Sequence, residues 1–119
     1  MRMMDTSQIK NEQDLIDALD GYSEFERAVY LMAYKIPKGK VSTYSRIAKM
    51  VGKPNAFRAV ANAMNKCPFW PVVPCHRVVA SDGRFTGSEK GAASRRKLIR
   101  DEGVPIQGGK VVLSDDILF

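Results

Sequence analysis

The stretch Pro74-Cys75-His76-Arg77-Val78-Val79 holds the single histidine of the chain beside one of its two cysteines. A thiol is an effective nucleophile only as the thiolate, and a neighbouring base is the usual way in which a protein forms one. Apolar residues precede the pair (Val72 and Val73) and follow it, a pattern typical of a tightly packed turn that holds a reactive side chain still. Because cysteine is also a common small core residue, an inert buried cysteine and a catalytic nucleophile both remain as interpretations.

The length and charge of the chain favour one folded domain with an anionic partner. The chain has 119 residues, 45% of them hydrophobic, and a formal net charge of +6. Residues 1–34 carry three basic and seven acidic side chains, whereas residues 35–119 carry sixteen basic and six acidic ones. Such a basic region is the footprint expected for nucleic acid, and a solvated basic surface is the alternative.

Several classes of protein are disfavoured by the sequence. It has no apolar run long enough to span a membrane and no secretory signal at its start, so we expect an intracellular protein, cytoplasmic or nucleoid-associated in a prokaryote and nuclear in a eukaryote. Two cysteines, Cys67 and Cys75, do not form a disulfide framework, and their spacing is not that of a metal clip. We expect no metal site and no cofactor.

Capping patterns predict two helices in the first third of the chain. Asn11 is a candidate N-cap for a helix over 12–20, which Gly21 ends. Ser23 with Glu26 forms a capping-box pattern for a second helix, which ends before Pro37. The core face of that helix is predicted from apolar spacing: Phe25, Val29, Met32 and Ile36.

The next segment has the pattern of a helix-turn-helix. Thr43 is a plausible cap for a helix over 44–51, Gly52-Lys53-Pro54 breaks the chain, and a second helix over 55–66 begins at Asn55 or Pro54. Small residues crowd the second helix, which suits close approach to a DNA groove or, equally, ordinary helix packing.

The last third is expected to contain a rigid connector, a basic helix and short strands. Residues 67–74 include three prolines and predict an extended connector. A helix over 91–102 is expected to end at Gly103, with short strands near 72–79 and 111–113. The outward-facing residues of this helix are predicted to be basic: Arg95, Arg96, Lys97 and Arg100. The expected fold class is α+β, mostly helical, with a winged helix-turn-helix-like arrangement.

The string Pro-Cys-His-Arg-Val resembles the active-site signature of the O6-alkylguanine-DNA alkyltransferases, the methylated-DNA–protein-cysteine methyltransferases. The helix starts at Val41-Ser42-Thr43-Tyr44 and at Phe57-Arg58-Ala59-Val60 are also similar to that family, as is Glu102. The resemblance covers about residues 22–107. It implies an N-terminal extension with a short helix over 1–22 and a DNA-binding alkyltransferase domain over 23–119, without the family's separate N-terminal domain.

The resemblance implies a reaction in which an alkyl group leaves the O6 oxygen of guanine in DNA for Cys75, irreversibly and once per molecule. His76 would draw off the thiol proton through a water, Glu102 would orient the imidazole, and Tyr44 would donate a proton or hydrogen bond to the departing guanine. This follows the nucleophile, base and orienter logic of the hydrolase triads.

By the same resemblance, a monomer binds double-stranded DNA through the minor groove and flips the damaged nucleotide, whose place Arg58 fills. The implied DNA contacts are Thr43, Tyr44, Arg58, Ala59 and Arg77. The implied walls and lid of the guanine pocket are Val78, Phe85, Thr86 and Gly87. The family usually has asparagine at the hinge position that Cys67 occupies here, so Asn65 in a shifted geometry or a differently held hinge are both open.

Two other functions compete with this one. The alkyltransferase-like proteins share the fold and flip the same damaged bases without reacting, but they carry another residue, often tryptophan, at the position of Cys75. A winged-helix transcription regulator would explain the helix-turn-helix and the charge. It would not explain Cys75-His76 together with Glu102.

Overall fold

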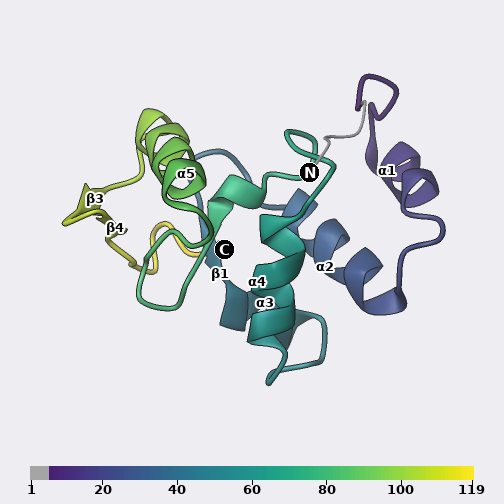
Figure 1. The fold of residues 1–119 in the computed structure, drawn as a ribbon, viewed down its shortest axis with the longest axis horizontal. Coiled ribbons are helices and arrows are strands. Elements are labelled where there is room, and N and C mark those ends of the chain that lie inside the picture. The colour runs from purple at the N-terminus through teal and green to yellow at the C-terminus, as the bar shows by residue number, and fades with distance from the viewer. Residues whose placement is uncertain (1–5) are drawn as a thin grey trace.

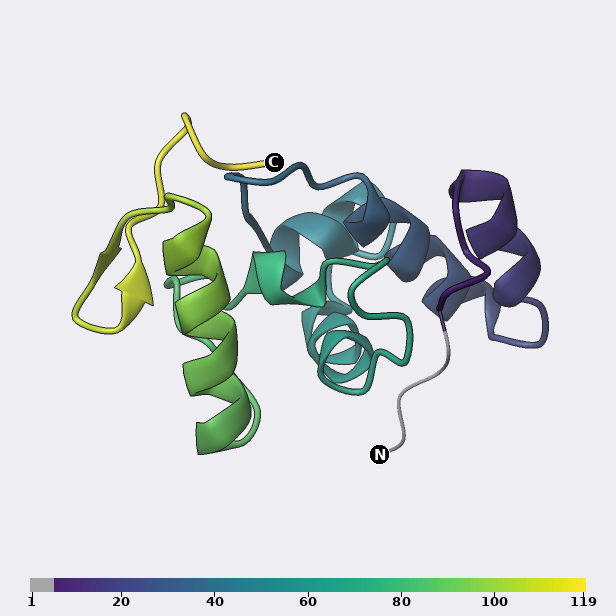
Figure 2. The same cartoon turned by 90° about the horizontal axis from the view of Figure 1, so that it is seen from above.

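The computed structural model describes residues 6–119, and helices dominate it. Helix α1 (Glu12–Ala18) lies at one end of the molecule, and helix α5 (Glu89–Asp101) lies towards the opposite end (Figure 1). Figure 2, from above, shows the same order. The space between them holds three helices: α2 (Glu24–Tyr34), α3 (Tyr44–Met50) and α4 (Phe57–Asn65).

Side-chain caps begin the helices where the sequence predicts them. The Asn11 side chain accepts a hydrogen bond from the Asp14 amide at the start of α1. Ser23 and Glu26 form the reciprocal capping box of α2. Thr43 Oγ1 accepts from the Arg46 amide at the start of α3. These three predicted starts are confirmed, and each satisfies an amide that the helix itself leaves unpaired.

The main core joins α1 through α4 to the chain that follows them. Its fully buried members include Leu15, Tyr30, Ile47, Val60 and Phe69. Burying an apolar side chain of this size contributes about 1.5–3 kcal/mol. Because Leu15 of α1 belongs to this core, the described part of the N-terminal extension packs with the rest of the chain. The domain division at residue 22 stays a prediction.

Helices α3 and α4 pack against each other and form the expected helix-turn-helix. The second of these helices begins later than predicted: α4 starts at Phe57, its N-cap is Ala56, and no side chain caps it. The prediction of Asn55 or Pro54 as its start is therefore wrong. Residues 51–55 form turns instead, and Gly52 has φ +80, a backbone conformation that glycine adopts without strain.

The strands are shorter than predicted and pair across the chain. Strand β1 (Ser42–Thr43) pairs in parallel with β2 (Val78–Val79), in the register Ser42 to Val78. Strand β3 (Ile106–Gln107) and strand β4 (Lys110–Val111) form a hairpin over Gly108-Gly109. The expectation of strands over 72–79 and 111–113 therefore holds only at Val78–Val79 and Val111.

The connector before Cys75 also differs from the prediction. Residues 68–73 form successive turns rather than an extended segment, and Cys75–Arg77 forms a 3-10 turn, η1. The amide of Val73 donates to the carbonyl of Phe69 at 3.0 Å, which holds this segment in a compact form. Proline restricts φ but leaves ψ free, so a proline-rich segment can turn as readily as extend.

The mixed, helix-dominated fold class is confirmed. A second, smaller core lies between the sheet ends and α5 and includes Val41, Val79, Ile99, Val104 and Val111. It places α5 beside η1, and the helix ends with Glu102 as C-cap and Gly103 at φ +89. Within residues 6–119 no helix is long and apolar enough to cross a membrane.

Candidate active site

The candidate site forms where η1 meets the ends of α4 and α5. Cys75 opens the 3-10 turn, and β2, directly after it, is held by β1 at the start of α3. Val73 and Val78, on either side of the turn, are fully or almost fully buried. The turn is therefore fixed at both ends, as the apolar flanks of the Cys-His pair predict.

His76 and Glu102 lie in contact, as the resemblance implies. His76 Nε2 lies 2.7 Å from Glu102 Oε2, and the histidine is only 6% exposed. The other ring nitrogen, Nδ1, accepts a hydrogen bond of 3.2 Å from the indole N–H of Trp70. Because an indole nitrogen can only donate, the neutral imidazole carries its proton on Nε2 and donates it to Glu102.

Burial lowers the pKa of His76 and outweighs the contacts with Glu102 that raise it, so the imidazole is neutral at neutral pH. Burial alone would raise the pKa of Glu102. The donors around this carboxylate, namely Arg77, His76 and the amide of Gly39, outweigh that effect and lower its pKa to about 2. The pair is therefore a neutral imidazole held by a carboxylate.

This arrangement changes what His76 can do. A base for the Cys75 proton needs an unoccupied ring nitrogen, and both nitrogens of His76 already have protein partners. The expectation that His76 takes this proton therefore requires Trp70 to move. Sequence reasoning did not single out Trp70, because its proximity to His76 depends on the turns of the connector.

Arg77 has a different set of partners from the DNA contact expected of it. Its Nε donates to Glu102 Oε1 at 2.9 Å, and its Nη1 donates to the carbonyl of Ile36 at 2.8 Å. The Arg77 side chain is 17% exposed. In this structure Arg77 therefore pairs with the carboxylate behind His76 and ties it to the segment just after α2. A DNA contact of Arg77 stays a prediction.

A cavity of about 480 Å³ opens beside Cys75. Its walls come from the end of α4, the connector, the loop before α5 and α5 itself. They include Met64, Asn65, Cys67, Trp70, Gly87 and Arg95. Of the four residues expected to form the pocket, only Gly87 lines this cavity. Val78 is buried in the main core, and Phe85 packs against the smaller core beneath the Arg96 guanidinium.

The Cys75 sulfur is surrounded by groups that favour the thiolate. The thiol of Cys67, which donates a hydrogen bond, is the largest influence and lowers the pKa of Cys75. Burial raises the pKa of Cys75, while the Arg95 cation and two backbone amides lower it, and the net change is downward. The hydrogen bond to Cys75 and burial both raise the pKa of Cys67.

Arg95 was predicted to face outward, and that prediction is wrong. Its Nη1 donates to Asn65 Oδ1 at 2.9 Å, its Nη2 donates to the carbonyl of Thr86, and its Nε donates to the carbonyl of Gly91. Gly87 lies against this guanidinium: a Cβ there would fall 2.6 Å from Nη2. Arg95 lies within a run of basic residues, and the spacing of charges along a helix does not show which of them has a backbone carbonyl within reach. The sequence therefore did not distinguish Arg95 from its neighbours.

The remaining lid and hinge residues form a connected set. Tyr44 Oη and Thr86 Oγ1 lie 2.6 Å apart, so the hydroxyl at the start of α3 is joined to the lid. Asn65 Nδ2 donates to Thr86 Oγ1 at 3.4 Å. Asn65 thus bridges α4 to the lid and to α5, while Cys67 lies beside Cys75. The hinge role remains a prediction for both residues.

The expected DNA-contacting residues separate into two groups. Arg58 and Ala59, in the first turn of α4, are exposed. Thr43 is buried, and its hydroxyl accepts the hydrogen bond that caps α3. A DNA contact of Thr43 stays a prediction. Phe57, beside Arg58, is an exposed aromatic side chain.

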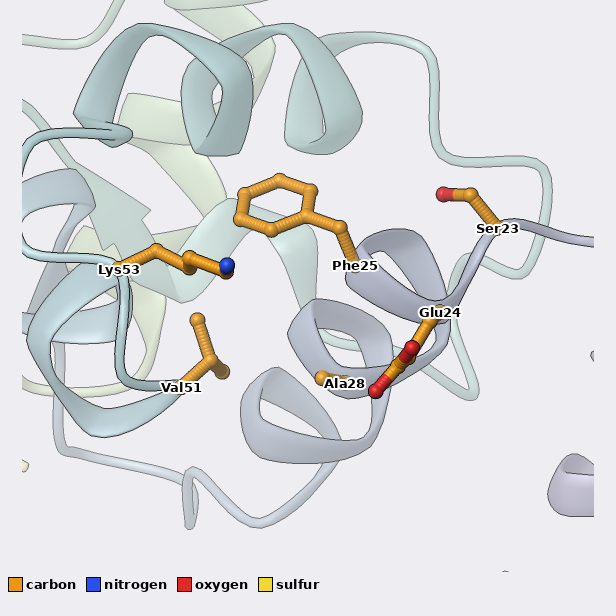
Figure 3. Close-up of a pocket in the computed structure, with 6 residues that line it drawn as sticks. All are labelled: Ser23, Glu24, Phe25, Ala28, Val51 and Lys53. Atoms are coloured by element: carbon orange, nitrogen blue, oxygen red, sulfur yellow. The ribbon is translucent and has the colours of Figure 1, made fainter.

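A second cavity lies away from this site. Figure 3 shows it between the start of α2 and the turn after α3, with Phe25, Val51 and Lys53 among its walls. No predicted catalytic residue lines it. In the described part of the chain, no group of three or more histidine, cysteine or acidic side chains is placed to hold a metal ion.

Comparison with known proteins identifies the family. Residues 24–104 match the family model described as 6-O-methylguanine DNA methyltransferase, DNA binding domain. The chain belongs to this family. It is 40% identical over 80 residues to the methylated-DNA–protein-cysteine methyltransferase of Methanosarcina barkeri, covering 67% of this chain and 51% of that protein. It is 38% identical over 90 residues to that of Salmonella typhimurium, covering 76% and 53%.

Solved structures show the same fold. The crystal structure of S. pombe Atl1 in complex with damaged DNA containing O6-carboxymethylguanine matches with a TM-score of 0.71 and 34% identity, covering 81% of this chain and 94% of Atl1. The Mycobacterium tuberculosis O6-methylguanine methyltransferase matches with a TM-score of 0.64 and 34% identity, covering 71% and 53%. The chain thus spans about half the length of the curated relatives that it matches.

Proposed function

We propose that this chain is a DNA-repair methyltransferase that moves the alkyl group of O6-alkylguanine in DNA to Cys75, once per molecule. The observation that carries the proposal is the cavity beside Cys75, in which the pKa of the thiol is lowered. A thiolate at the wall of a cavity is positioned to attack a carbon that enters it. The names of the curated relatives agree with this chemistry.

The reaction forms one bond and breaks one. The Cys75 sulfur attacks the alkyl carbon in line, the bond from that carbon to the guanine O6 breaks, and its electron pair leaves with guanine. Guanine is a poor leaving group as a bare anion. The Tyr44 hydroxyl, held by Thr86 at 2.6 Å, is the donor that we propose for a ring nitrogen of the departing base. The thioether product has no easy route back.

Binding to DNA is proposed to occur through the first turn of α4. Arg58 is exposed there, and Ala59 beside it presents a small surface that permits close approach to a groove. We propose that α4 enters the minor groove of double-stranded DNA, that the damaged nucleotide is flipped, and that Arg58 fills the space it leaves. Flipping costs a few kcal/mol, and less for a badly paired base. Two structural neighbours solved in complex with DNA, one of them with damaged DNA, support DNA binding by this fold.

A non-catalytic damage-binding protein is the second candidate. The match to S. pombe Atl1 favours it, because that comparison covers 94% of the neighbour's length whereas the methyltransferases match over about half of theirs. The two candidates differ in whether Cys75 becomes alkylated when the lesion is bound.

Peptide mapping distinguishes them. The protein is mixed with a duplex that contains one O6-methylguanine, digested, and the peptide that contains Cys75 is weighed. A methyl group on Cys75, absent in Cys75→Ser and with undamaged DNA, supports the transferase. Retention of the duplex with unmodified Cys75 supports the damage-binding protein.

A further inference from the structure

Arg95 joins three segments around the candidate cavity, and the reaction proposed above gives it no role. Its Nη1 donates to Asn65 Oδ1 at the end of α4, at 2.9 Å. Its Nη2 donates to the carbonyl of Thr86 in the loop before α5, and its Nε donates to the carbonyl of Gly91 at 3.2 Å. Gly87 leaves room for this group, because a Cβ there would fall 2.6 Å from Nη2. The guanidinium is therefore held in one orientation.

This orientation determines which way the Asn65 amide points. Because a guanidinium has no acceptor, the amide oxygen of Asn65 faces Arg95 and its nitrogen faces away. That nitrogen, Nδ2, donates to Thr86 Oγ1 at 3.4 Å, which is long for such a bond. The Thr86 oxygen therefore accepts from α4, and the single hydrogen of its hydroxyl is left to donate.

The Tyr44 hydroxyl is the acceptor for that hydrogen. Thr86 Oγ1 and Tyr44 Oη lie 2.6 Å apart, a distance that by itself allows either atom to be the donor. The direction matters because Tyr44 also has one hydroxyl hydrogen. If Tyr44 donated to Thr86, that hydrogen would be occupied. If Thr86 donates to Tyr44, the Tyr44 hydrogen is left for another acceptor that enters the site.

We propose that Arg95 is a positioning residue of the reaction: through Asn65 and Thr86 it sets the direction of a hydrogen-bond chain that leaves the Tyr44 proton free for the departing guanine. The inference rests on the proposed function, in which Tyr44 is that donor. Every hydrogen between Arg95 and Thr86 stays on its own residue, so no bond within the chain is broken. The positive charge at one end polarises the chain towards donation by Tyr44.

The test follows single-turnover methyl transfer at saturating duplex with one O6-methylguanine. Arg95→Met removes every donor from a long side chain and should slow transfer about 10- to 100-fold, because hydrogen bonds from a charged group are lost. In a Tyr44→Phe background the same substitution should change the rate by no more than about twofold, since the hydroxyl on which it acts is absent. Equal effects of Arg95→Met in the two backgrounds would overturn the proposal.

Asn65→Asp separates the direction of the chain from simple attachment. An aspartate still accepts from Arg95, now as an ion pair, but its carboxylate cannot donate to Thr86. The proposal predicts transfer about 10-fold slower or more in protein whose stability is not reduced. This loss should also disappear in Tyr44→Phe, which distinguishes it from an effect of the new charge on Cys75. Transfer at the unaltered rate in Asn65→Asp would refute the directional chain.

Arg96→Met is the matched control on the next residue of α5. The Arg96 Nε donates to the carbonyl of Gly109 at 3.2 Å, and its guanidinium lies 5.7 Å from the centroid of the Phe85 ring. Neither contact belongs to the chain from Arg95 to Tyr44. Arg96→Met should therefore leave the transfer rate within about twofold of the unaltered rate. A loss of rate as large as that of Arg95→Met would give Arg95 a general structural role and contradict the proposal.

Urea unfolding without DNA tests the chain apart from the transferase. The effects of Arg95→Met and Tyr44→Phe on the unfolding free energy should not add, because one network contains both residues, whereas those of Arg96→Met and Tyr44→Phe should add. Non-additive losses in a protein that transfers no methyl group would uphold the hydrogen-bond chain and refute the transferase. Additive losses, with methyl transfer that Arg95→Met leaves unchanged, would uphold the transferase and refute the chain.

Discussion

Replacing Glu102 with glutamine removes the carboxylate that both His76 and Arg77 contact. Glutamine has nearly the same shape but no charge, so the Arg77 guanidinium, 17% exposed, loses its ion pair. His76 Nε2 loses a charged acceptor as well. We expect the variant to fold with reduced stability at neutral pH.

The magnitude follows from two independent arguments. Removing one partner of a largely buried ion pair costs about 3–5 kcal/mol, because the other charge remains buried. The pKa of Glu102 is lowered from 4.5 to about 2. A shift of that size corresponds to about 3 kcal/mol by linkage, at about 1.4 kcal/mol per unit. The two figures agree in order of magnitude.

The pH dependence of the unfolding free energy tests this prediction more specifically than its value at neutral pH. Because the folded-state pKa of Glu102 lies below its unfolded value, its contribution is complete above about pH 4.5 and is lost as the pH falls towards about 2. Glu102→Gln lacks this contribution at every pH. The stability curves of the two proteins should therefore converge as the pH falls through this window.

Urea unfolding followed by circular dichroism, repeated from neutral pH downward, measures both effects. The matched control is Asp101→Asn on the preceding residue, whose carboxylate is 58% exposed and pairs only with Lys97 within the described residues. A surface pair of this kind contributes about 0–1 kcal/mol. Two results would refute this account of the buried ion pair. One is an equal loss of unfolding free energy in Glu102→Gln and Asp101→Asn. The other is a difference in unfolding free energy between wild type and Glu102→Gln that stays constant as the pH falls from about 4.5 to about 2.

Four further changes test other parts of the structure. Arg58→Ala should weaken binding to any duplex and lower the slope of log affinity against log salt by about one, measured by salt titration; an unchanged slope would place the DNA elsewhere. Gly87→Ala should lower the unfolding free energy by about 1–2 kcal/mol or more in chemical denaturation, because φ is +90 and the new Cβ meets Arg95. Ser23→Ala should cost about 0.5–2 kcal/mol through loss of the α2 cap, and a smaller change in denaturation would discount the capping box. Tyr44→Phe should slow methyl transfer in single-turnover kinetics while the fold is retained, and an unchanged rate would remove Tyr44 from the reaction.

Local sequence signals predicted the starts of α1, α2 and α3. Asn11, Ser23 and Thr43 each contact an amide within three residues, so the pattern alone contains the information for these caps. The two strand pairs were not predicted in this form. The β1 and β2 strands have two residues each and lie far apart in the sequence, and their pairing depends on how the cores assemble.

The candidate site was predictable in its chemistry and not in its detailed contacts. The Cys75-His76 dipeptide was identified from its residues and Glu102 from a resemblance, and His76 and Glu102 lie 2.7 Å apart. The position of Trp70 was not predicted, and the prediction that Arg95 faces outward is wrong. Trp70 reaches His76 through the turns of residues 68–73, and Arg95 donates to the carbonyl of Thr86 in the loop before α5. Neither hydrophobic periodicity nor charge pattern predicts such turns and loop carbonyls.

The most direct test of the central proposal is the intact mass of the protein after incubation with excess duplex that contains O6-methylguanine. The account predicts a gain of one methyl group per molecule and no more, with no further turnover when fresh lesion is added. An unchanged mass under conditions in which the lesion duplex is bound would contradict it.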